Sequence, residues 1–154
     1  MPKIYYWLLM AVIAWAAVLV LVPWPKIRKL LGVGFWGGLV LTIVIQAAAV
    51  YFLGLWKFNY MLIPTLGFPV FLPFMWFAET IIFINFLPEE RNNRIVYITA
   101  ISAATTLLGY FILTAGLQTY IRWNLFYNFI LSLVSHSAIA YFYLARVGST
   151  KIRT

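Results

Sequence analysis

Long apolar runs separated by short polar stretches are the main pattern along this chain of 154 residues. A helix needs roughly 20 apolar residues to cross the hydrocarbon layer of a bilayer. Five runs of about that length lie at residues 4–22, 30–53, 69–87, 95–119 and 125–145. The connections between them are short, which forces consecutive helices to run antiparallel. The pattern therefore predicts an all-α fold, with residues 1–154 forming one integral membrane bundle of five transmembrane helices.

The third run is irregular at its start. Pro64, Pro69 and Pro73 fall in or just before its first half, and each proline removes a backbone donor and crowds the preceding turn of a helix. We expect residues 61–68 to form a short interfacial or re-entrant stretch, with the regular helix beginning near Pro69 or Pro73. Irregular backbone at membrane depth is tolerated only against protein or water, so this entry is either a binding cleft or simply a kinked helix start.

Composition agrees with a membrane protein. Hydrophobic residues make up 65% of the chain and charged residues 9%, whereas soluble domains are about half apolar and a quarter charged. The net charge is +8, but the positive residues lie in short connections and not on one exposed face, as nucleic-acid binding requires. We therefore expect the lipid bilayer, and no nucleic acid, as a partner.

The positive residues also predict an orientation, because cytoplasmic loops accumulate Lys and Arg. The amino-terminal stretch and the second and fourth connections carry three of these residues, Lys3, Lys57 and Arg122. The first and third connections and the carboxyl-terminal tail carry the other eight: Lys26, Arg28, Lys29, Arg91, Arg94, Arg146, Lys151 and Arg153. The amino terminus is expected outside and the carboxyl terminus in the cytoplasm, as in a multi-pass protein of the cell membrane.

Two ionisable residues lie inside the apolar runs. Glu79 is the only acidic residue within a run and His136 is the only histidine of the chain. A charge at the centre of a span costs roughly 2.5–3.5 kcal/mol, so such side chains normally face the interior and have a partner. Both lie about 13–15 Å from the cytoplasmic boundary by helical rise. We expect them to meet as an uncharged carboxylic acid and imidazole, with a charged pair as the alternative.

Further polar residues follow at helical spacing. Asn128, Ser132 and Ser135 form one stripe with His136 in the last run, and Gln46 is predicted in the outer half of the membrane with Asn128. The fourth run carries a weaker stripe, which consists of Ser102, Thr105, Thr106 and Thr114.

Three interpretations of this polar centre remain open. It could be a satisfied interhelical hydrogen-bond network, because Ser, Thr and Gln commonly join membrane helices. It could be a site for a lipophilic ligand such as a quinone, an isoprenoid or a lipid, with His136 and Glu79 hydrogen-bonded to its polar head. It could also be a proton or ion pathway, because buried Glu and His residues are common relays.

Small residues begin the second run. Gly34 and Gly38 are four residues apart and therefore lie on one helix face, and small residues let membrane helices approach closely. We expect this face to pack inside the bundle or to form a homodimer seam.

The residues that several kinds of chemical site require are missing from this sequence. Cysteine is absent, which excludes disulfides and thiolate metal sites, and a single histidine cannot complete a zinc site alone. Phosphate-binding glycine loops, nucleophile elbows and HExxH motifs are missing as well. The expected role is a structural or accessory membrane component without its own catalysis, with no metal and no cofactor apart from a bound lipid or quinone. Lateral membrane proteins or a second copy are the expected partners.

Three stretches carry a resemblance. They are "VPWPKIRK" after the first run, "IIFINFLPEE" at the end of the third and "YIRWNLFYNFILSL" at the start of the fifth. Together they resemble small multi-span membrane proteins widespread in endospore-forming Firmicutes. The resemblance implies a similar architecture but no activity, and it marks Pro88, Glu89, Trp123 and Asn124 as family-like positions. The fourth run departs from the family pattern, because it lacks an acidic residue before "YIRWN".

Overall fold

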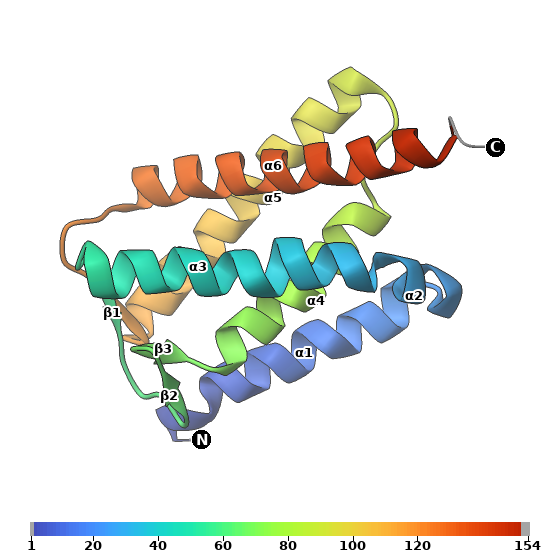
Figure 1. Cartoon of the computed structure of the whole chain (residues 1–154). Helices are drawn as coiled ribbons and strands as arrows, with labels where there is room; N and C mark the ends of the chain where they lie inside the picture. Colours follow the sequence, from blue (N-terminus) through green and yellow to red (C-terminus); the bar gives the residue numbers. More distant parts are fainter. Residues whose placement is uncertain (1, 152–154) are drawn as a thin grey trace.

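The computed structural model describes residues 2–151, without the side chains of residues 65 and 147–151. Most of the described chain is helical (Figure 1). A 3₁₀ turn (Lys3–Tyr5) leads into α1 (Tyr6–Leu21), and a long helical segment follows, made of α2 (Trp24–Val33), a π-helical stretch (Gly34–Val40), α3 (Leu41–Ala47) and a second π-helical stretch (Ala48–Phe52). The remaining helices are α4 (Phe71–Asn85), α5 (Arg91–Thr114) and α6 (Leu125–Lys151).

Four segments of the described chain are long and apolar enough to cross a membrane: Lys3–Leu21, Trp24–Phe52, Arg91–Thr114 and Leu125–Arg146. They correspond to the runs predicted at 4–22, 30–53, 95–119 and 125–145. Two boundaries differ. The second segment begins at Trp24 because the basic stretch after Pro25 continues as helix, and the fourth ends at Thr114 because Gln118–Tyr120 forms a strand.

The predicted span at 69–87 is wrong in length. Helix α4 has 15 residues, which is about 22 Å by helical rise against roughly 30 Å for the hydrocarbon layer. It begins at Phe71, within the predicted interval. Pro73 is its third residue, where the missing N–H has no partner within the helix to lose.

Four short strands were not predicted. Strand β1 (Trp56–Phe58) pairs antiparallel with β4 (Gln118–Tyr120), and β2 (Pro64–Thr65) pairs antiparallel with β3 (Phe68–Pro69). The β2–β3 hairpin occupies the stretch expected to be interfacial or re-entrant. Its turn contains Leu66 and Gly67, with φ of 50° and 74°.

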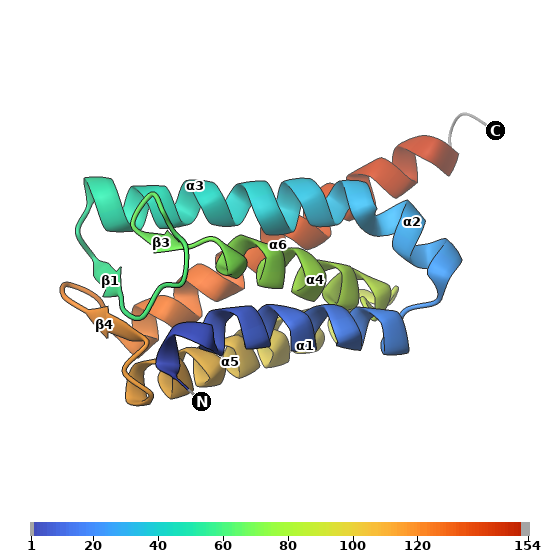
Figure 2. The same ribbon diagram turned by 90° about the horizontal axis from the view of Figure 1, so that it is seen from below.

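The helical segments cross the molecule in alternating directions. Figures 1 and 2 show the amino terminus and the strands at one end, and the α1–α2 and α4–α5 connections with the carboxyl terminus at the other. The basic residues of the first and third connections therefore lie at the same end of the bundle. The alternation agrees with the antiparallel arrangement expected from the short connections.

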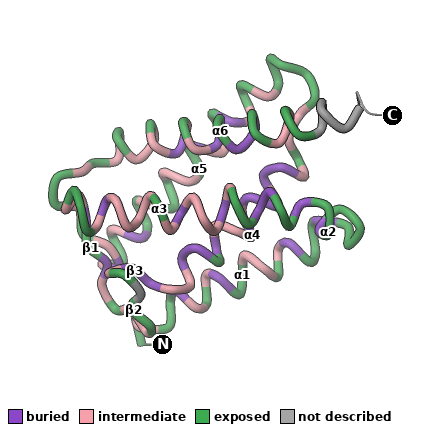
Figure 3. Tube along the Cα trace, in the orientation of Figure 1, coloured by how far each residue is buried: buried purple, intermediate pink, exposed green. Residues whose placement is uncertain are grey.

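Helix α4 is the centre of the bundle, in contact with α1, α2, α3, α6 and the first π-helical stretch. Figure 3 shows buried residues recurring along α4 and exposed residues on the outer turns of the other helices. The side chains of Ala78, Ile81 and Phe83 on α4 are almost fully buried. Large apolar side chains such as Val20 and Phe52, 83% and 84% exposed, cover much of the outside. A soluble monomer rarely exposes such a surface, whereas a bilayer solvates it.

The two glycines predicted to mediate packing lie against α4. A Cβ atom at Gly38 would lie 2.6 Å from the backbone Cα of Phe77 and from the carbonyl oxygen of Trp76. A Cβ atom at Gly34 would lie 2.6 Å from the ring of Phe77. Both glycines are buried, so this face serves packing within the chain and is not a free homodimer seam.

Candidate functional site

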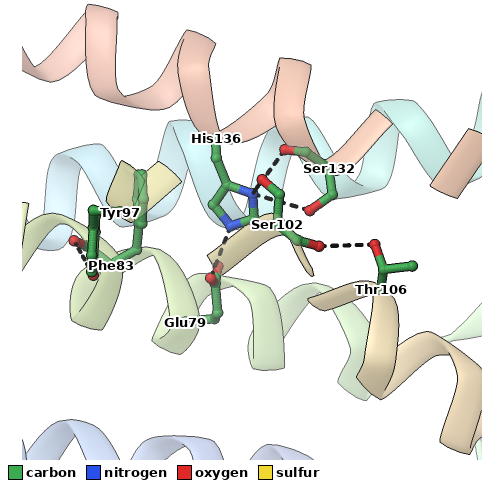
Figure 4. Close-up of polar contacts among 7 residues, drawn as sticks. All are labelled: Glu79, Phe83, Tyr97, Ser102, Thr106, Ser132 and His136. Atoms are coloured by element: carbon green, nitrogen blue, oxygen red, sulfur yellow. Dashed lines mark hydrogen bonds and ion pairs between the residues drawn. The ribbon is translucent and has the colours of Figure 1, made fainter. Parts of the chain in front are cut away.

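Glu79 on α4 and His136 on α6 meet inside the bundle, as predicted. The Nε2 atom of His136 lies 3.0 Å from Oε1 of Glu79 (Figure 4). The His136 side chain is 1% exposed and that of Glu79 is 29% exposed. The two rare ionisable groups therefore satisfy each other through a direct hydrogen bond.

The other ring nitrogen defines the tautomer of the imidazole. Nδ1 of His136 lies 2.8 Å from the backbone carbonyl oxygen of Ser132, and a carbonyl oxygen can only accept a hydrogen bond. Nδ1 therefore carries a proton. The hydrogen bond at Nε2 then holds one further proton, either on Glu79 with a neutral imidazole or on the imidazole with a carboxylate. In both forms the pair has no net charge.

One oxygen of the Glu79 carboxyl group has no hydrogen-bond partner among the described residues. This atom, Oε2, is buried. The neutral pair and the charged pair are both compatible with this geometry, so the neutral pair stays a prediction.

Two serines and the ring of Phe83 lie against the imidazole. The Oγ atoms of Ser132 and Ser102 lie 3.1 and 3.4 Å from Nδ1, and the ring of Phe83 contacts the imidazole edge-on at 4.8 Å between centroids. Figure 4 shows that Ser102 comes from α5, so three helices meet at this point. The weaker stripe of the fourth run contained Ser102, but its spacing could not indicate which of its residues reaches the histidine.

A cavity of about 110 Å³ lies beside this polar centre. Its walls come from α1, α3, the π-helical stretch before α3, α4, α5 and α6, and at one end it reaches β1 and β4. Aromatic side chains line much of it, namely Trp7, Trp56, Phe58 and Trp76. His136 and Ser132 border the cavity, whereas Glu79 is not part of its lining.

The remaining predicted site residues line the same cavity. Gln46, Asn128 and Ser135 all contribute to its wall. Oε1 of Gln46 accepts a hydrogen bond from the indole Nε1 of Trp56 at 3.0 Å. Tyr120 lies on β4, at the end of the cavity that reaches the strands. Burial raises the pKa of its phenol to about 12, and the phenol is neutral at physiological pH. All four residues of the predicted stripe of the last helix therefore line the cavity, and Ser132 also contacts the imidazole of His136.

The family-like positions have local structural contacts. The indole of Trp123 packs edge-on against Trp56 at 5.2 Å. Oδ1 of Asn124 accepts a hydrogen bond from the backbone N–H of Tyr127, as in an N-terminal helix cap. The backbone carbonyl of Glu89, the residue after Pro88, accepts a hydrogen bond from Arg94. These contacts organise the ends of α5 and α6.

Metal ligation has no support in the described part of the chain, where no three His, Asp or Glu residues lie together. No family model, curated protein or solved structure matches this chain.

Proposed function

We propose that this protein is an integral membrane component without its own catalysis that holds a small lipophilic molecule in the cavity between α3, α4, α5 and α6. The observation that carries the proposal is the cavity itself, which has an aromatic lining and a few polar groups. Sites for small molecules in proteins usually combine these two features.

The placement in the membrane is part of the proposal. The four long apolar segments cross the bilayer, and α4 makes a shorter fifth crossing inside them. Because α4 is surrounded by protein, its ends need not reach the bilayer surface themselves. The excess of basic residues at one end supports a cell-membrane protein with the amino terminus outside and the carboxyl terminus in the cytoplasm.

The size of the cavity limits what it can hold. An engineered cavity of about 150 Å³ in another protein binds benzene, and the volume here is about 110 Å³. In this proposal the bound group is therefore no larger than a single ring. A longer lipophile would place only its head there and keep its tail between the helices or in the bilayer.

The Glu79–His136 pair has a positioning role in this proposal. Both imidazole nitrogens have partners within the protein, so neither is free to bind the head of a ligand as the sequence suggested. The hydrogen bonds instead hold α4 and α6 together at the wall of the cavity. The partners of Nδ1 are two serine hydroxyls and a backbone carbonyl, and none of them is an acidic or basic side chain. We therefore propose ligand binding and not a proton pathway.

Filling the cavity tests this function. Ser135 lines the cavity, whereas Ser137 on the same helix is exposed. Purified wild-type protein and the variant Ser137→Leu are expected to yield a stoichiometric lipophile in an organic extract analysed by mass spectrometry. The extract of Ser135→Leu is expected to contain at least tenfold less of that compound than the extract of Ser137→Leu.

Equal thermal unfolding and gel-filtration profiles of the two variants would show that Ser135→Leu retains the fold. Extracts without a stoichiometric compound, or with the same amount from both variants, would contradict the proposal.

A further inference from the structure

We infer that the cavity selects an uncharged, ring-sized head group that carries a carbonyl oxygen, recognised by Gln46 and Asn128. The inference rests on the proposed function and specifies the ligand class. It follows from which polar atoms at the cavity already have partners and which are still available.

The orientation of the Gln46 amide is fixed by Trp56. The indole Nε1–H of Trp56 can only donate, and it lies 3.0 Å from Oε1 of Gln46. Because the oxygen of the amide accepts this bond, the available atom of Gln46 is the donor Nε2. This atom has no hydrogen-bond partner within residues 2–151. A ligand atom that meets Gln46 must therefore be an acceptor.

Asn128 supplies a second group on the opposite helix. Its side chain lines the cavity and makes no hydrogen bond to another described residue. Room for this amide depends on Gly109 of α5, because a Cβ atom at residue 109 would lie 3.0 Å from Nδ2 of Asn128. The amide is thus accommodated at the cavity by a neighbouring glycine and has its hydrogen-bonding capacity free.

The lining also excludes a charged head. It contains no Asp, Glu, Lys or Arg residue, and the imidazole of His136 has both nitrogens engaged. A carboxylate or phosphate placed there would lose its hydration without a counter-charge, which is strongly unfavourable. The cavity therefore favours a neutral carbonyl head over a fatty acid or a phospholipid head group.

Aromatic contacts complete the description of the ligand. The indole of Trp56, which orients Gln46, also lines the cavity, as do Phe58 and Trp76. Aromatic side chains pack well against flat rings in offset or edge-on arrangements. A carbonyl attached to a ring, as in an aromatic ketone or a quinone, matches both the donor and the aromatic walls.

Three probes of similar size test the inference. Acetophenone carries the ring and the carbonyl, isopropylbenzene has a similar size without the carbonyl, and benzoate carries a charge. Binding to the purified full-length protein is measured by equilibrium dialysis with the same detergent on both sides. Each probe is compared between variants, which cancels its uptake into micelles.

The variants remove the polar groups at nearly constant volume. Gln46→Met and Asn128→Leu are expected to weaken acetophenone binding about three- to tenfold, the loss typical of one neutral hydrogen bond, and to leave isopropylbenzene binding unchanged. Ser137→Leu is the control and changes neither. Benzoate is expected to bind more weakly than both other probes in the wild-type protein.

The outcomes separate this inference from the proposed function. If both variants weakened the binding of acetophenone and isopropylbenzene equally, or if benzoate bound best, the selection of a carbonyl group would be overturned. A lipophile in the extract would still support the proposed binding function. Failure of all three probes together with a clean extract would overturn both.

Discussion

The two ionisable side chains inside this bundle, Glu79 and His136, form a hydrogen bond with each other. His136 is almost fully buried, and the backbone carbonyl of Ser132 determines that Nδ1 carries a proton. Nε2 then depends on Glu79, the residue 3.0 Å away. Because Oε2 of Glu79 has no partner in the described chain, we expect the acid to act as a neutral donor to the imidazole.

Substitution of Glu79 tests this assignment. Glu79→Gln keeps a neutral N–H donor for Nε2 and is expected to change the free energy of unfolding by less than about 1 kcal/mol. Glu79→Leu leaves Nε2 buried without a partner and is expected to cost about 1–3 kcal/mol. The measurement is reversible unfolding of the purified variants in mixed micelles. Equal destabilisation by Gln and Leu would instead indicate a charged pair.

At the scale of elements, α4 is short, central and in contact with most of the other helices. Its close approach to the π-helical stretch Gly34–Val40 depends on two glycines. At Gly38 an added Cβ would meet backbone atoms, which cannot move independently. At Gly34 it would meet the ring of Phe77 and a side-chain carbon of Ile81, which can adjust. The same substitution should therefore have different costs along one helix.

A series of alanine substitutions tests this gradation. Gly38→Ala is expected to destabilise the protein most, by about 1–3 kcal/mol as for overpacked cores, and Gly34→Ala less. Gly32→Ala is the control, because its Cβ would lie 3.7 Å from a side-chain nitrogen of Arg146, an ordinary contact distance. Unfolding in mixed micelles ranks the three variants. A cost for Gly32→Ala equal to that for Gly38→Ala would contradict the packing described here.

The whole molecule has two chemically different ends. The amino terminus and the strands lie at one end, and the α1–α2 and α4–α5 connections, with five of the eleven Lys and Arg residues in or beside them, lie at the other (Figure 1). Between the β2–β3 hairpin and the start of α5, the chain crosses the molecule once, through α4. The position of these two connections relative to the membrane therefore reports both the orientation and whether the short helix crosses the bilayer.

Single cysteines can report this topology, because the chain contains no cysteine. Ile63 and Asn92 are exposed and uncharged, so Ile63→Cys and Asn92→Cys leave every basic residue in place. A membrane-impermeant maleimide added to intact cells is expected to label Ile63→Cys at least tenfold more than Asn92→Cys. Permeabilised cells should label both.

Stronger labelling of Asn92→Cys than of Ile63→Cys in intact cells would show that the orientation is opposite to the predicted one. Labelling of both positions in intact cells would show that α4 does not cross the bilayer.

The sequence alone determined the features that depend on local pattern. Long apolar runs predict membrane helices because the backbone must satisfy its own hydrogen bonds in lipid, and four of these helices have close to the expected bounds. The meeting of Glu79 and His136 was also predictable, because each is rare and matched in depth to the other. The sequence also showed that Gly34 and Gly38 form a packing face, but it did not show which helix this face contacts.

Only the tertiary structure decided the length of α4, the strand pairing and the cavity. Strand β1 pairs with β4 from 60 residues further along the chain, and three-residue strands have too few positions to show an alternating pattern. The bond between Trp56 and Gln46 likewise depends on the turn that brings β1 back against α3. Such non-local contacts have no signature in hydropathy, because hydropathy records which residues avoid water and not which neighbours they find.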